Sequence, residues 1–239
     1  MINMFKSKLP SNNSSRGIVE NALMAAFSLF VNGFGIYLTI KANLGVSPWD
    51  VLNIGLSNSL HVLYGTASIG VSLLILLIDI WMKEPIGLAM FIDAIVVGKS
   101  VDLFNYLDII KPSENVWTGL LYMIVGLFII GYTQYFYMKA ALGCGPRDTL
   151  LVGVKKRLKK IPIGVLGILI QGTATLIGYL LGGPVGVGTV ICVLLQGPIM
   201  QLAFKSFHFD ATGIKHESII ESAYVFAGSL KRHGIIKQS

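Results

Sequence analysis

The sequence Leu-Gly-Val-Ser-Pro-Trp-Asp at residues 44–50 returns 98 residues later as Leu-Gly-Cys-Gly-Pro-Arg-Asp at residues 142–148. We call these stretches the first and second LGxxPxD motifs. They belong to a longer repeat, in which residues 33–60 match residues 131–158 at eleven positions. After a one-residue insertion the repeat continues to residue 202 with eight further matches. The chain is therefore predicted to be a duplication of one structural unit.

The composition indicates whether this protein lies in water or in a membrane. Of its 239 residues, 54% are hydrophobic and 13% are charged, and the mean hydropathy is +0.71. About a quarter of the residues of a soluble domain are charged, and a chain this apolar would leave a large hydrophobic surface in water. We therefore expect an integral membrane protein that contacts the lipid bilayer. The net charge of +7 then reflects Lys and Arg in cytoplasmic loops rather than nucleic-acid binding.

Six segments are long and apolar enough to cross a bilayer as helices, which requires about 20 residues each. Three of them fall in each copy of the repeat. The predicted class is thus an all-α, polytopic helical membrane protein with six transmembrane helices. The segments run, approximately, over residues 20–41, 62–82, 86–107, 116–138, 162–182 and 185–206.

An odd number of spans per copy means that the second copy enters the membrane from the opposite face. Such inverted repeats are typical of secondary transporters, and we expect a 3+3 inverted repeat here. The segments after the motifs, 51–61 and 149–160, are too short to cross, because a twelve-residue helix is only about 18 Å long. We expect each to be a short interfacial or re-entrant helix.

The distribution of basic residues predicts the orientation. With the N-terminus inside, sixteen of the nineteen Lys and Arg residues lie in cytoplasmic segments, so both termini are expected in the cytoplasm. The predicted organisation has four parts. They are a cytoplasmic N-terminal segment (1–19), a first three-span repeat (20–110), a second three-span repeat (116–206) and a cytoplasmic C-terminal tail (207–239).

Two interpretations of the motifs stay open. In the first, they are helix starts: Pro48 and Pro146 suit a first helical position, and Asp50 and Asp148 lie where a capping box places its acidic residue. In the second, the short helices dip into the membrane and direct their positive N-terminal ends at a substrate or ion. In either case the inverted topology predicts Trp49 at the outer interface and Arg147 at the cytoplasmic one.

Polar residues inside predicted spans are further candidates for function. Asp93 lies near the middle of the third segment, while Lys99 and Asp102 are three residues apart and are expected to pair with each other. Gln196, together with other glutamines and threonines, is expected to form hydrogen bonds between helices. The candidate ligand-binding residues are therefore Pro48, Asp50, Pro146, Asp148, Asp93, Lys99, Asp102 and Gln196.

Motifs for catalysis and for cofactors do not occur in the sequence. The Gly-Lys-Ser at 98–100 lacks the preceding glycine of a phosphate-binding loop, and no serine nucleophile elbow or zinc-binding HExxH is present. Cys144 and Cys192 do not suggest a disulfide framework or a thiolate metal site. We expect no enzyme activity, no cofactor and no metal.

The motifs also carry a resemblance. The first LGxxPxD motif with Gly-Leu-Ser at 55–57, the second with Val-Gly-Val at 152–154, LLGGPVGVGT at 180–189 and QGPIMQL at 196–202 resemble the YczE-like (YczE/YyaS/YitT) family of bacterial integral membrane proteins. The resemblance runs from about residue 20 to 205. It implies a bacterial plasma-membrane protein without an assigned function. The first repeat departs from the family pattern, because KEPIGLAM replaces GGPVGVGT.

Two functions fit the sequence. The first is a small-molecule or ion transporter or exporter, with its site between the two LGxxPxD motifs. The alternative is a non-transporting regulator, scaffold or substrate-capture subunit, whose protein partner docks on the basic loop 155–160.

Overall fold

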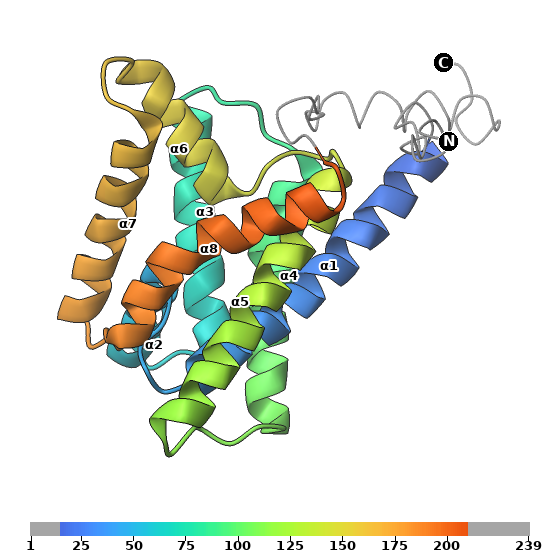
Figure 1. Cartoon of the computed structure of the whole chain (residues 1–239). Helices are drawn as coiled ribbons and strands as arrows, with labels where there is room; N and C mark the ends of the chain where they lie inside the picture. Colours follow the sequence, from blue (N-terminus) through green and yellow to red (C-terminus); the bar gives the residue numbers. More distant parts are fainter. Residues whose placement is uncertain (1–14, 210–239) are drawn as a thin grey trace, which may run out of the picture.

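The structure is a computed structural model, and it describes residues 15–209 (Figure 1). Every regular element in that range is a helix, as the sequence predicts. Most of the expected N-terminal segment 1–19 and of the C-terminal tail 207–239 lies outside the described residues. The helices are α1 (Ser15–Lys41), α2 (Pro48–Leu60), α3 (Tyr64–Trp81), α4 (Leu88–Leu107), α5 (Val116–Lys139), α6 (Pro146–Arg157), α7 (Ile163–Leu180) and α8 (Val187–Ser206).

The helix order of the first half returns in the second half: one long helix, one short helix, then two long helices. Within the described residues, five helices are long and apolar enough to cross a membrane, namely α1, α3, α5, α7 and α8. The remaining long helix, α4, occupies the third predicted span but carries Asp93, Lys99 and Asp102. The multi-pass helical membrane class is thus confirmed, with five spans recognised by composition.

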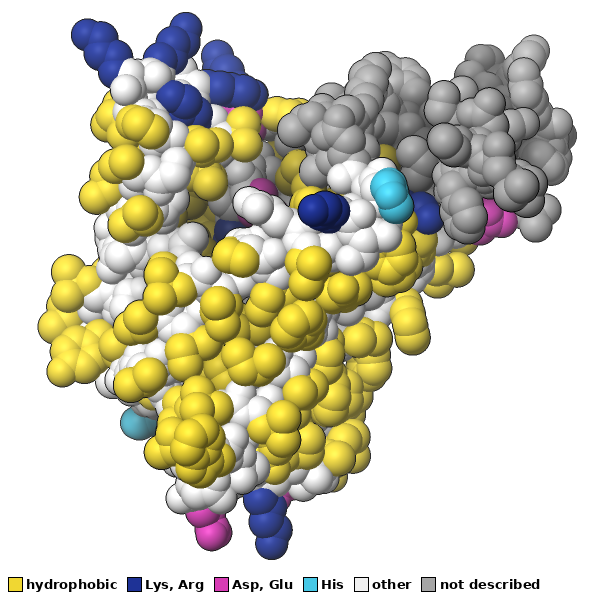
Figure 2. Space-filling model, in the orientation of Figure 1, with side chains coloured by type: hydrophobic (Ala, Val, Ile, Leu, Met, Phe, Trp, Pro, Cys, Tyr) yellow, Lys and Arg dark blue, Asp and Glu magenta, His cyan; other side chains and the backbone are white. Residues whose placement is uncertain are grey.

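The outer surface is apolar between two charged ends. Large hydrophobic side chains point away from the protein along the long helices; Phe27 is 71% exposed and Leu180 is 75% exposed. Figure 2 shows this hydrophobic surface, with Lys and Arg gathered mainly at the end where α6 and α7 join. Because such an area would be unfavourable in water, it is the surface that lipid covers.

The two halves interlock through their short helices. The long helices α1 and α5 pack against each other at the centre, with α4 against α1 and α8 against α5. Each short helix packs on a long helix of the other half, α2 against α7 and α6 against α3 (Figure 1). Neither half therefore buries its short helix alone.

Equivalent backbone contacts hold the two halves together. The Ala89 amide donates a hydrogen bond to the Leu142 carbonyl at 3.0 Å, and the Gly188 amide donates one to the Leu44 carbonyl at 2.6 Å. The two bonds join the same positions of the repeat. They place the Leu-Gly of each LGxxPxD motif on the Pro-x-Gly turn of the opposite half.

The glycines of the motifs are required for this contact. Gly45 and Gly143 have φ values of +99° and +115°, a conformation that side chains disfavour. A Cβ on Gly87 would lie 2.3 Å from the Leu142 carbonyl oxygen, and one on Gly186 would lie 2.4 Å from that of Leu44. The chain therefore breaks at both motifs, between a long helix and the short helix that follows it. Gly87 and Gly186 are equivalent in the repeat and make equivalent contacts, although KEPIGLAM surrounds the first and GGPVGVGT the second.

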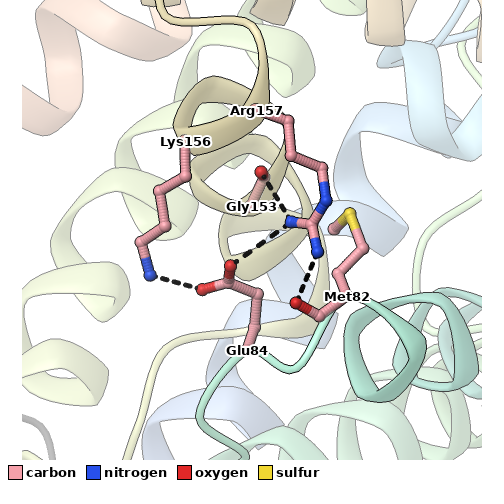
Figure 3. A network of polar contacts seen from close by, with 5 residues as sticks. All are labelled: Met82, Glu84, Gly153, Lys156 and Arg157. Carbon is pink, nitrogen blue, oxygen red and sulfur yellow. Dashed lines mark hydrogen bonds and ion pairs between the residues drawn. The ribbon is translucent and has the colours of Figure 1, made fainter.

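The C-terminal ends of the short helices are attached in a corresponding way. The Ser59 hydroxyl of α2 donates to the Leu181 carbonyl at 3.0 Å. At the equivalent position of α6, the Arg157 guanidinium donates to the Met82 carbonyl at 2.6 Å (Figure 3). Each short helix thus ends on the turn between two long helices of the other half.

Candidate functional site

A polar cavity of about 390 Å³ lies where the two LGxxPxD motifs meet. Figure 2 shows a hollow on this side of the molecule, between the column of α6 and α7 and the helix α8, with charged side chains in its depth. Both halves contribute equivalent positions to its wall. These pairs are Asn32 and Ile130, Ile36 and Gln134, Thr39 and Tyr137, Ser47 and Gly145, Trp49 and Arg147, Asp50 and Asp148, Ser72 and Gln171, Asp93 and Cys192, and Val97 and Gln196.

Both short helices begin at this cavity. Pro48 is the first residue of α2 and Pro146 the first residue of α6, as expected for proline at helix starts. Pro48 lines the cavity, whereas Pro146 is buried beside it. The N-terminus of a helix carries about half a positive charge. The motifs therefore direct two positive helix ends at one polar space.

Trp49 and Arg147 are in contact across the cavity. The guanidinium carbon of Arg147 lies 5.1 Å from the centre of the Trp49 ring, within the range of a cation–π interaction. The expectation that these residues occupy opposite membrane interfaces is therefore wrong. Each short helix runs from the centre of the molecule toward one end, so the residues at the helix starts meet instead of separating.

Asp50 of the first motif has its hydrogen bonds satisfied inside the protein. The Tyr64 hydroxyl donates to its Oδ1 at 2.7 Å, and the Ser47 hydroxyl donates to its Oδ2 at 2.6 Å. Ser47 occupies the cap position of α2 but makes no side-chain bond to the helix backbone. The Asn53 amide donates in turn to the Tyr64 hydroxyl at 3.3 Å. This network fixes the Asp50 carboxylate, which is 2% exposed.

Asp148 of the second motif lacks such donors. Glycine replaces serine at position 145, and at the repeat position of Tyr64 the second half has Ile163. The space that a side chain on Gly145 would occupy is surrounded by three oxygens instead. A Cβ built there would lie 3.3 Å from Asp93 Oδ2, 3.7 Å from Asp148 Oδ2 and 3.7 Å from the Tyr137 hydroxyl.

The Tyr137 hydroxyl has an unused hydrogen-bonding capacity. Tyr137 is 2% exposed, and its hydroxyl has no hydrogen-bond partner in the described part of the chain. A buried hydroxyl without a partner costs free energy. Here the group lines the cavity beside Asp93 and Asp148, so a molecule in the cavity would provide the missing partner.

Two candidate residues lie away from the cavity. Lys99 is exposed, and no ion pair joins it to Asp102, so the predicted pair is not formed. Asp102 Oδ1 instead accepts a hydrogen bond of 2.7 Å from the Gly65 amide. Because Gly65 lies in the first turn of α3, where amides have no partner within the helix, Asp102 caps that helix from α4.

Gln196 lines the cavity, but the expected polar bonds between helices are absent among its neighbours. The hydroxyls of Thr173 and Thr175 donate to the carbonyls of Leu169 and Gln171 in their own helix. Of the candidate residues, the structure thus brings together Pro48, Asp50, Asp93, Asp148 and Gln196.

Sequence reasoning missed Tyr137, Trp49 and Arg147 as residues of the cavity. A signal was present in the repeat itself. At Ser47 and Gly145 the two halves differ by a hydroxyl, and at Thr39 and Tyr137 they differ in the length of the side chain that carries one. Both pairs are among the positions where the two walls of the cavity differ.

Comparison with known proteins assigns the family. The profile of a family of unknown function (DUF6198) matches residues 19–205, from the first turn of α1 to the end of α8. The chain belongs to this family. The matched region of this chain contains both LGxxPxD motifs and all the residues that line the cavity between them.

Curated relatives bear out the resemblance seen in the motifs. An uncharacterized protein of Haemophilus influenzae is 29% identical over 73% of this chain and 79% of its own length. The uncharacterized membrane protein YczE of Bacillus subtilis is 28% identical over 73% of this chain and 81% of its own. The uncharacterized protein YyaS of the same organism is 27% identical, over 73% and 87%. No solved structure matches the chain.

Proposed function

We propose that this DUF6198 protein is a transporter of a small molecule or ion in the bacterial plasma membrane, with its binding site in the cavity between the two motifs. The protein crosses the membrane six times as a 3+3 inverted repeat. In Figure 1, α1, α4 and α7 run in one direction through the molecule and α3, α5 and α8 run in the other. The second half thus repeats the first with reversed direction.

α4 packs against both α1 and α3, which supports counting it as a transmembrane helix in addition to the five recognised by composition. Its two acidic residues face protein: Asp93 lines the cavity and Asp102 caps α3. Lys99 is exposed, and a lysine side chain is long enough to place its charge at the interface. Because of its charged residues, α4 is not recognised as a span by hydropathy. Its two aspartates nevertheless lie inside the bundle, where charged residues of transmembrane helices usually lie.

The basic end of the molecule supports cytoplasmic termini. The start of α1 and the junction of α6 and α7 lie at the same end in Figure 1, where Lys and Arg gather in Figure 2. Lys155, Lys156, Arg157, Lys159 and Lys160 all belong to that junction. Cytoplasmic loops carry such an excess of basic residues.

The observation that carries the proposal is a difference between the two halves at equivalent glycines. In the first half α3 closes on α4, since a Cβ on Gly65 would lie 2.3 Å from the Gly98 carbonyl oxygen. In the second half the same positions, Gly164 and Gly197, have no atom within 4 Å of such a Cβ. The cavity is closed beside one pair of helices and open beside the other.

This asymmetry is what alternating access requires. Gly65 begins α3 at the end away from the basic loop, and Gly164 begins α7 at the basic end (Figure 1). The cavity thus opens toward the cytoplasmic side and is sealed toward the outside. Because the halves have the same design, closing α7 on α8 and opening α3 from α4 would reverse the access.

The contacts of the basic loop argue against the scaffold alternative. Lys155 donates to the carbonyls of Lys159 and Ile161, and Figure 3 shows Lys156 and Arg157 directed at Glu84. Glu84 is 8% exposed. Lys156 and Arg157 therefore attach α6 to the turn after α3, and Lys155 is bound within its own loop, so three of the five basic side chains of the loop are engaged inside the protein.

Thiol accessibility tests the transporter without knowledge of the substrate. Gly197 lines the cavity and has room for a side chain, so Gly197→Cys is placed in a chain with Cys144→Ala and Cys192→Ala. A membrane-impermeant maleimide is applied to spheroplasts and to inside-out vesicles. Lys160→Cys and Lys111→Cys serve as controls for the cytoplasmic and outer faces.

A transporter exposes its site to each side in turn, so we expect Gly197→Cys to react from both faces. Each control should react from one face only. If Gly197→Cys reacts only from the cytoplasmic face, the cavity does not alternate and the transport proposal is wrong.

A further inference from the structure

We infer that the cavity binds the ammonium group of an organic amine at the oxygens of Asp93, Asp148 and Tyr137. This inference rests on the proposed function, because it names the substrate class of the same site. Its basis is the different treatment of the two motif carboxylates.

In the first half, hydrogen-bond donors of the protein satisfy both oxygens of the Asp50 carboxylate. The Ser47 hydroxyl is 2.6 Å from Asp50 Oδ2, and Tyr64 supplies the second donor. In the second half the repeat keeps the aspartate, as Asp148, but supplies neither donor. Gly145 leaves the place of the serine side chain vacant, beside the Tyr137 hydroxyl that has no partner. A bound group that donates hydrogen bonds would fill this place.

The charges around the cavity favour a cation. Three carboxylates line it, those of Asp50, Asp93 and Asp148, against one guanidinium, that of Arg147, which stacks on Trp49. Two helix N-termini add about half a positive charge each. With the carboxylates ionised, the sum is still about one negative charge, and in a low-dielectric bundle such a charge needs compensation.

The residues present do not suggest a divalent metal ion. No group of three or more His, Cys, Asp or Glu side chains that could hold a metal occurs in the described part of the chain. An ammonium group needs only hydrogen-bond acceptors, and two carboxylates and a hydroxyl provide them.

The size and the lining favour an organic cation over a bare ion. A volume of about 390 Å³ lies in the range of small-molecule sites and would hold about 13 waters at about 30 Å³ each. Beyond the acidic group the wall combines polar residues, such as Ser72, Gln134 and Gln196, with the apolar side chains of Ile36, Leu127, Ile130, Val193 and Met200. An amine with an apolar body would place its charge on the carboxylates and its body on this wall.

A second groove extends the apolar wall toward the lipid. It runs between α7 and α8, is lined by Leu176, Tyr179, Val190 and Leu194 among others, and shares Val193 with the cavity. At the equivalent place in the first half, α3 packs directly on α4. The groove lies along the C-terminal half of α7 and the N-terminal half of α8, at the side of the molecule that faces lipid, and it would accommodate the apolar part of the same amine.

Phenethylamine is a suitable probe, because it joins a primary amine to an apolar ring. Phenethyl alcohol is its neutral counterpart. Binding is measured by isothermal titration calorimetry on the full chain in nanodiscs. We expect the wild type to bind the amine and not the alcohol, since only the amine neutralises the carboxylates.

The sharpest variant is Gly145→Ser, which gives the second half the serine of the first. The atoms nearest to the new Cβ are all side-chain ends, so the protein should fold with unchanged or higher thermal stability. The new hydroxyl would donate to Asp148 and occupy the amine site. We expect phenethylamine affinity to fall at least about tenfold, the loss of one charge-assisted hydrogen bond. Gly70→Ser, in open space on α3, is the matched control with unchanged affinity.

Asp148→Asn and Tyr137→Phe provide a second measurement, and each should also weaken amine binding at least about fivefold, since each removes one acceptor or one hydroxyl. Equal binding of alcohol and amine, binding of Na⁺ without the amine, or full affinity in both Gly145→Ser and Asp148→Asn would overturn the amine assignment. If the amine fails to bind but Gly197→Cys reacts from both faces, only the substrate class is wrong. If the amine binds and Gly197→Cys reacts from one face, transport is wrong and the amine site stands.

Discussion

Replacing Gly87 by alanine tests the interlocking of the two halves. The φ of Gly87 is −102°, which alanine adopts freely, so the cost is steric. The added methyl group would lie 2.3 Å from the Leu142 carbonyl oxygen and 2.5 Å from the Gly143 Cα. Both are backbone atoms of the second motif, and they cannot rotate away. The hydrogen bond of 3.0 Å from the Ala89 amide to Leu142 would be stretched as well.

The expected cost combines these two effects. Overpacking costs about 1–3 kcal/mol, and a lost hydrogen bond about 1 kcal/mol. We therefore expect Gly87→Ala to lower the free energy of unfolding by roughly 2–4 kcal/mol. For a chain of this size this corresponds to a fall in Tm of roughly 4–16 °C. Thermal unfolding of the purified protein in detergent, followed by tryptophan fluorescence, measures it.

Two comparison variants make the result specific. Gly186→Ala should cost a similar amount, because it meets Leu44 as Gly87 meets Leu142. Gly70→Ala, with no atom within 4 Å, should be neutral or stabilising by up to about 1 kcal/mol, since alanine favours helix. A Gly87→Ala protein as stable as Gly70→Ala would refute the reasoning about the interlocked turns.

Two further predictions use the same unfolding assay. Tyr64→Phe removes a hydrogen bond to the buried Asp50 carboxylate and should cost about 1–3 kcal/mol, while Tyr106→Phe, at an 87% exposed position, should cost nothing measurable; equal effects would contradict the buried network. Asp102→Ala should lower the free energy of unfolding by about 1 kcal/mol, because it removes the cap of α3. Lys99→Ala, at an exposed position, should be within about 0.5 kcal/mol of wild type. A comparable loss in both variants would instead support an ion pair between Lys99 and Asp102.

The sequence predicted the helices well because their signals are local. Hydropathy, proline positions and the repeat placed six long and two short helices within a few residues of those observed. The polarity of α4 was visible too, but which of its charges face protein depends on its neighbours.

Contacts between distant segments were beyond the sequence. Lys99 and Asp102 are close on one helix, yet Asp102 binds the free amide at the start of α3, a partner that only the packing of α3 on α4 supplies. Trp49 and Arg147 were assigned to opposite interfaces because the length of a short helix does not reveal how deep inside the protein the helix starts. The same depth brings Tyr137 beside Asp93 and Asp148.

The meeting of the two motifs is the central claim, and crosslinking tests it most directly. Trp49→Cys and Arg147→Cys are combined in a chain with Cys144→Ala and Cys192→Ala, with a protease site inserted between Lys111 and Glu114. A bis-methanethiosulfonate reagent spanning about 5–10 Å is added, and the chain is then cut. In the native protein the Arg147 guanidinium carbon lies 5.1 Å from the centre of the Trp49 ring, so the two halves should stay joined until a reductant is added. If the motifs instead lay at opposite interfaces, about 30 Å apart, the halves would separate, and the shared cavity would be wrong.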